Sequence, residues 1–157
     1  MKALVLCGGK PQIALIEELK KRGIFAILAD GNERSVAAPY ADKFYKVSTL
    51  DIDGIEKIAV TENVNMILSV YADQMLLVAA QLSEKLNLPC YIDYETAKNV
   101  SSKKYMKKIF VEHGIPTAKY IVGDMVSYKS IDGLAFPLVV KPVDCYSSRG
   151  SQKSREL

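Results

Sequence analysis

The sequence lacks what several protein classes require. It has no uninterrupted apolar run of the roughly 18 residues that a membrane helix needs, and its start is too short for a signal-peptide core. Its three cysteines, Cys7, Cys90 and Cys145, are odd in number and far apart, which fits reduced, non-catalytic thiols rather than a disulfide framework or a zinc site. We therefore expect a cytoplasmic protein without a membrane partner.

Strong charge and paired histidines are also missing. The formal net charge of +3, from 21 Lys and Arg against 18 Asp and Glu, is too small to indicate nucleic-acid binding. The single histidine, His113, has no second histidine to share a metal ion with, so we expect no metal site here. Hydrophobic residues make up 49% of the chain, which is enough for a globular core.

Short apolar runs alternate with helical patterns over the first 95 or so residues. Strands are predicted at Lys2–Cys7, Ile24–Ala29, Lys43–Ser48 and Met66–Val70, with helices after Pro11, at Ile52–Val60 after a capping Asp51, and from Met75 to Leu86. In that last helix Met75, Val78, Ala79, Leu82 and Leu86 share one face. Because parallel strands need crossover connections, the pattern predicts an α/β fold with a Rossmann-like parallel sheet, covering residues 1–93.

A different pattern begins at residue 94 and defines a second predicted unit, residues 94–157. Helices are expected at Tyr94–Val100 and Lys103–His113, with Ser101 or Ser102 capping the second one. Strands are expected at Lys119–Val122 and Leu138–Lys141.

Two glycines follow the first predicted strand, at the edge where open α/β sheets bind ligands. Gly8 and Gly9 could let a substrate approach the backbone, although a simple tight turn is the commoner explanation of such a pair. They lack the G-x-G-x-x-G spacing of a dinucleotide site. Asp30 could bind a ribose hydroxyl, but an Asp before a Gly more commonly forms a turn.

A lysine ends the predicted strand at Leu138–Lys141 and precedes a loop rich in small, donor-bearing residues. Lys141 supplies a point charge for phosphate oxygens, and the residues from Val143 to Gly150 include serines and a glycine that can fold over the same anion. This combination is typical of a phosphate clamp, and a solvated lysine before an ordinary loop is the alternative.

The spacing of Ser102-Lys103 before Gly114-Ile115-Pro116, together with residues 136–150, resembles the ATP-grasp superfamily of ligases. The beginning of the chain resembles that family's pre-ATP-grasp domain, including "PYAD" at 39–42 and "AQLSEKLNLP" at 80–89. The likeness is nearest to carbamoyl-phosphate-synthase-like and biotin-carboxylase-like members. It implies an ATP-dependent ligase that activates a carboxylate as an acyl phosphate, and a second unit that is the start of an incomplete α+β ATP-grasp subdomain.

The resemblance also implies which residues bind. ATP phosphates would contact Lys103, Lys141, Ser147, Ser148, Arg149 and Gly150. A small-molecule carboxylate substrate would lie near Gly8, Gly9 and Asp73, at the ends of the first unit's strands. The remaining lysines, Lys98, Lys104, Lys107 and Lys108, are expected to form a solvated helix face rather than a nucleic-acid patch.

The chain departs from the family pattern near Leu157. The acidic residues that read adenine and ribose, and the Glu and Asn that hold magnesium, do not follow Gly150, so Mg²⁺ and tight ATP binding are expected only in a longer parent protein. Ser151 and Ser154 stand where the family has apolar residues of the next helix, which suggests a shortened chain made soluble by substitution. The alternatives are a stand-alone, non-catalytic binding module and an NAD-binding protein, and a homodimer is left open.

Overall fold

The computed structural model describes residues 1–123, 133–143 and 151–154. The chain divides into two compact units, Met1–Lys98 and Asn99–Leu157. The division lies inside a helix, five residues after the boundary expected at residue 93. No helix in the described part of the chain is both long enough and apolar enough to cross a membrane.

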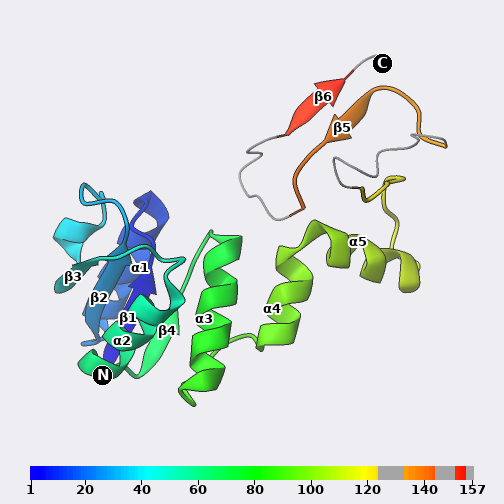
Figure 1. Cartoon of the computed structure of the whole chain (residues 1–157). Coiled ribbons are helices and arrows are strands. Elements are labelled where there is room, and N and C mark those ends of the chain that lie inside the picture. Colours follow the sequence, from blue (N-terminus) through cyan, green and yellow to red (C-terminus); the bar gives the residue numbers. More distant parts are fainter. Residues whose placement is uncertain (124–132, 144–150, 155–157) are drawn as a thin grey trace. The chain divides into compact units, whose positions relative to one another are not determined.

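Unit 1 alternates strands and helices in the order that the sequence predicts (Figure 1). Its elements are β1 (Lys2–Leu6), α1 (Lys10–Lys21), β2 (Phe25–Asp30), η1 (Ala38–Tyr40), β3 (Lys43–Lys46), α2 (Ile52–Glu62), β4 (Met66–Leu68) and α3 (Asp73–Lys85). The four strands form one sheet in the order β3-β2-β1-β4, and every neighbouring pair is parallel. The predicted α/β fold with a parallel sheet is confirmed.

The two faces of this sheet are covered by different helices, because successive strand residues point to opposite sides. On one face Leu4, Leu6 and Ile27 pack with apolar residues of α2 and α3. On the other, Ala3 and Val5 pack in a cluster that includes Ile16 and Leu19 of α1. The predicted apolar face of α3 is confirmed, since Met75, Val78, Ala79 and Leu82 are buried and Leu86 packs against the same cluster.

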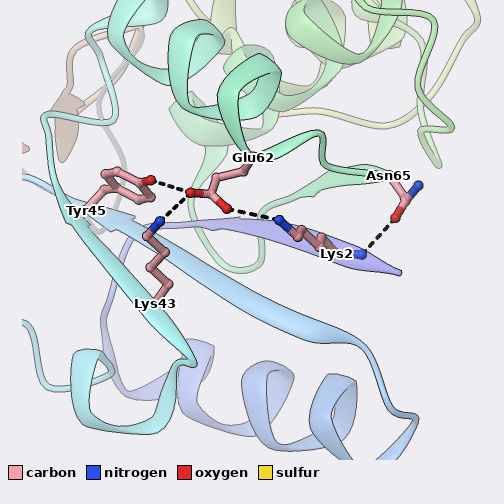
Figure 2. A network of polar contacts seen from close by, with 5 residues as sticks. All are labelled: Lys2, Lys43, Tyr45, Glu62 and Asn65. Carbon is pink, nitrogen blue, oxygen red and sulfur yellow. Dashed lines mark hydrogen bonds and ion pairs between the residues drawn. The ribbon is translucent and has the colours of Figure 1, made fainter.

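The buried carboxylate of Glu62 links helix α2 to strands β1 and β3, at the edge of the sheet where the parallel strands begin. Glu62, the last residue of α2, accepts hydrogen bonds from Lys43 Nζ and Tyr45 Oη, both at 2.5 Å, and from Lys2 Nζ at 3.1 Å (Figure 2). Lys2 also donates its backbone N–H to Asn65 Oδ1 at 2.8 Å. Donation from Lys43, Tyr45 and Lys2 lowers the pKa of Glu62 to about 2. Its charge is thus fixed at the edge opposite to the one that usually binds ligands.

Unit 2 begins within α4 (Tyr94–Ser101) and contains α5 (Lys103–Glu112), β5 (Leu138–Val140) and β6 (Gln152–Ser154). The two strands pair antiparallel, with Val139 opposite Lys153. Among residues 99–123, 133–143 and 151–153, none is buried. The described part of this unit therefore has no hydrophobic core of its own.

Two expectations for unit 2 are wrong. Residues 119–122 form no strand in the described structure, because their backbone pairs with no other strand among the described residues. The serines expected on a helix, Ser151 and Ser154, instead flank or end strand β6. The argument that they replace apolar residues at helical spacing therefore loses its basis.

Candidate functional site

The carboxyl edge of the sheet in unit 1 brings three predicted residues to one side of the fold. Gly8 and Gly9 follow β1, and Asp73 is the first residue of α3 after β4. Because β1 and β4 are parallel neighbours, their ends meet at the same edge. Gln12 Nε2 in α1 donates to the carbonyl of Val70 at 2.7 Å. This bond links the helix that follows β1 to the loop that follows β4.

Gly8 is required by the packing of this edge. Its N–H donates to Asp30 Oδ2 at 2.6 Å, and its carbonyl accepts from Ser35 Oγ at 3.0 Å. A Cβ at this position would lie 1.7 Å from Ser35 Oγ. The tight-turn interpretation thus explains Gly8, while contact of Gly8, Gly9 and Asp73 with a substrate stays a prediction.

Asp30 serves the same turn. Besides Gly8, its carboxylate accepts the backbone N–H of Asn32 at 2.7 Å. These two bonds use the side chain within the protein, which supports the turn interpretation over ribose binding.

Two residues at this edge have a backbone that sequence reasoning missed. Cys7 after β1 and Tyr71 after β4 both have positive φ, 69° and 57°. Such values are uncommon for residues other than glycine and cluster at functional sites. Burial raises the pKa of the Cys7 thiol, so it is protonated at neutral pH, in keeping with the expectation that it is not catalytic. No sequence signal marks Tyr71, because nothing about a tyrosine predicts left-handed backbone.

The predicted phosphate lysines lie on two segments of unit 2 that touch. Lys103 begins α5, and Lys141 comes directly after β5. The backbone N–H of Lys103 donates to the carbonyl of Val143, two residues beyond Lys141, at 2.9 Å. This bond places the start of α5 beside the end of β5, as a shared phosphate site requires. Ser147, Ser148, Arg149 and Gly150 lie outside the described residues.

The predicted serine cap of α5 is present in position but makes no capping hydrogen bond. Ser102 occupies the N-cap position. The first N–H groups of this helix are therefore not satisfied by the serine hydroxyl.

Comparisons with known proteins agree on one superfamily. No family model matches the chain. A 3-methyl-D-ornithine–L-lysine ligase of Methanosarcina barkeri is 29% identical over 119 residues, 74% of this chain and 32% of the relative. An L-amino acid ligase of Bacillus licheniformis matches 99% of this chain and 39% of its own at 19% identity and a TM-score of 0.76. An N5-carboxyaminoimidazole ribonucleotide synthetase solved with ADP matches 99% of this chain and 41% of its own at 20% identity and a TM-score of 0.78.

The resemblance to ATP-grasp ligases is confirmed. The parallel sheet of unit 1 matches the N-terminal domain of these ATP-grasp enzymes. The chain spans about a third of the length of the curated relative.

One lysine that was expected on a solvated surface has a structural role. Lys107 was expected on a solvated face, yet its Nζ contacts Thr117 Oγ1 and lies 5.5 Å from the centre of the Tyr120 ring. It therefore connects α5 to the segment that follows the helix. Lys98 and Lys108 pair with Glu95 and Glu112 on their own helices, as solvated lysines do.

Metal-ligating side chains are not clustered in the described residues. No group of three or more His, Cys, Asp or Glu side chains that could hold a metal ion occurs in the described part of the chain. Because Mg²⁺ can be held by one or two carboxylates together with nucleotide phosphates, a magnesium site stays a prediction.

Proposed function

We propose that this chain is the N-terminal part of an ATP-dependent ligase that joins a carboxylate to an amine. The carboxylate would be activated by the γ-phosphate as an acyl phosphate, which the amine then attacks with release of phosphate. The observation that carries the proposal is the match of 99% of the chain to a synthetase solved with ADP, together with the sequence likeness to a ligase named for two amino acids.

The two units would divide the work. We propose that residues 1–93 form the pre-ATP-grasp domain, which holds the substrate at its carboxyl edge, and that residues 94–157 begin the ATP-grasp domain. The lack of buried residues in the described part of unit 2 supports this, since a two-stranded sheet is marginal alone. By itself the chain would not bind ATP tightly and would not turn over its substrates.

Lys103 and Lys141 would hold phosphate oxygens from two sides. Lys103 is at the N-terminal end of α5, where the helix dipole disfavours a cation, and an anion bound there would offset that cost. Lys141 would add a second positive charge beside it. Residues 147–150 would close over the phosphates. ATP, when bound, supplies the phosphoryl group, and the described residues give no basis for a step through Mg²⁺.

Calorimetric titration of Mg-ATP tests the proposal. We expect binding by the product of the complete gene, and about tenfold weaker binding after Lys141→Ala, because a charge-assisted hydrogen bond to phosphate is lost. Lys119→Ala, which removes an exposed lysine of the same unit, should leave the affinity unchanged. If the complete product ignores ATP, the ligase proposal fails and the binding-module alternative gains support.

Three more detailed expectations about the protein stay predictions. The carbamoyl-phosphate-synthase-like assignment, a cytoplasmic location and a homodimer belong to this group. Product analysis with bicarbonate or an amino acid as the carboxylate, and ammonia or a second amino acid as the amine, would separate a carbamoyl-phosphate-type reaction from amino acid ligation.

A further inference from the structure

Tyr71 combines two properties that rarely occur together. Its φ of 57° lies in the left-handed region, and its side chain is 88% exposed. Two other residues with positive φ in the described chain, Asn63 and Asn87, are asparagines at helix ends, where this conformation is routine. A bulky residue in this region costs free energy, and an exposed ring regains little of it by burial.

Neighbouring contacts, rather than the Tyr71 ring, hold this turn. The carbonyl of Val70 accepts from the buried Gln12 at 2.7 Å, and the carbonyl of Ser69 accepts from Tyr91 Oη at 2.8 Å. On the other side, the N–H groups of Met75 and Leu76 both donate to the carbonyl of Ala72 at 3.0 Å. The fold thus fixes the backbone on both sides of Tyr71 and presents its ring to solvent.

Tyr71 lies at the edge of the sheet where open α/β folds bind ligands. Tyr71 follows β4 at the carboxyl edge, next to the glycines that follow β1, and Asp73 lies two residues further on. The face of a tyrosine ring attracts ammonium groups.

We propose that Tyr71 contacts the substrate and that its ring receives the ammonium group of an amine-bearing small molecule. This inference rests on the proposed ligase function, for which it names the substrate class at the carboxyl edge. The unfavourable positive φ of Tyr71 is then retained because it positions the aromatic ring for contact with the ligand.

Thermal melting of the 157-residue chain tests whether the backbone of Tyr71 is strained without a compensating contribution of its ring to stability. Tyr71→Gly should raise the melting temperature by about 2–4 °C, because glycine adopts positive φ without strain. Asn87→Gly is the matched control and should change it by less, because Asn already tolerates this region. A lower melting temperature for Tyr71→Gly would mean that the ring stabilises the fold, and would overturn the inference.

Ligand titration followed by amide NMR tests whether the Tyr71 ring binds an ammonium group. L-lysine should shift signals of Gly8, Gly9 and Asp73, whereas Nα,Nε-diacetyl-L-lysine, which lacks both ammonium groups, should not. Tyr71→Phe should bind L-lysine as the unchanged chain does, and Tyr71→Leu should bind about tenfold more weakly. Tyr40→Leu, an exposed tyrosine of η1, is the control and should leave binding unchanged.

Three results would overturn the inference: no shift with L-lysine, equal shifts with the diacetylated compound, or unchanged affinity in Tyr71→Leu. The Mg-ATP titration with Lys141→Ala is independent, because Lys141 belongs to unit 2. ATP binding without the amine effect removes this inference alone. An amine effect without ATP binding removes the ligase proposal and leaves Tyr71 as an amine-binding residue.

Discussion

At the scale of single residues, Gly8 shows a position where one methyl group decides stability. Its missing Cβ leaves room for Ser35 Oγ and for Asp30 Oδ2, which would lie 1.7 and 2.9 Å from an added carbon. Gly8→Ala should therefore destabilise the chain by about 2 kcal/mol or more, since β1 is central in the sheet and cannot move aside. Urea denaturation measures the loss.

Gly9 provides the matched control. A Cβ there would meet the flexible end of Gln12 at 3.1 Å, so Gly9→Ala should cost well under half as much. Partial rescue of Gly8→Ala by Ser35→Gly would identify the clash as the cause. Equal losses for Gly8→Ala and Gly9→Ala would contradict the packing argument.

At Ser83, in contrast to Gly8, substitution by alanine should stabilise the chain. Ser83 is fully buried in α3, and its hydroxyl has no hydrogen-bond partner in the described structure. A buried hydroxyl without a partner costs roughly 1–3 kcal/mol, and alanine also favours a helix. Ser83→Ala should raise the free energy of unfolding by about 1 kcal/mol in urea denaturation, whereas a loss would show that the hydroxyl has a partner after all.

At the scale of elements, Glu62 links α2 to β1 and β3. The pKa of its carboxyl is lowered to about 2, so the folded state stays ionised where the unfolded chain takes up a proton. The stability from this group is present above the unfolded pKa near 4.5 and is lost as the pH falls from there towards 2. In that window, unfolding should involve uptake of up to about one proton at Glu62.

Glu62→Gln should remove that proton uptake and flatten the dependence of the unfolding free energy on pH between about 4.5 and 2. Denaturation at a series of pH values measures the slope. Glu33→Gln is the control, because Glu33 forms an exposed pair with Lys46 and should leave the slope nearly unchanged. An unchanged slope in Glu62→Gln would contradict the role given to this carboxylate.

Most elements of unit 1 were predictable because their signals are local. The face of α3 and the cap of α2, where Asp51 Oδ1 accepts the N–H of Gly54 at 3.0 Å, follow from spacing of three or four residues. The strand expected at 119–122 failed because strands depend on a distant partner. The same limit applies to the site. Lys103 and Lys141 could be predicted as phosphate contacts from a family resemblance and stay predictions, whereas the φ of Tyr71 depends on contacts made by Gln12 and Tyr91.

At the scale of the whole molecule, the two units differ in what stabilises them. Unit 1 has apolar clusters on both faces of its sheet, and strands β1 and β2 are almost wholly buried. The described residues of unit 2 have no buried position, and β5 exposes Val139 and Val140. Local opening costs little where few apolar contacts break. Unit 2 should therefore open far more readily than unit 1.

Amide hydrogen exchange of the 157-residue chain measures this difference. The amides of Leu4 and Ile27 should exchange only through global unfolding of unit 1, and those of β5 about 100-fold faster or more, since each factor of ten corresponds to about 1.4 kcal/mol of opening free energy. In the product of the complete gene, the β5 amides should become protected if further polypeptide covers this sheet, while those of Leu4 stay unchanged. Equal protection of β1 and β5 in the 157-residue chain would show that unit 2 has a core of its own, and the proposal that it is only the beginning of a domain would fail.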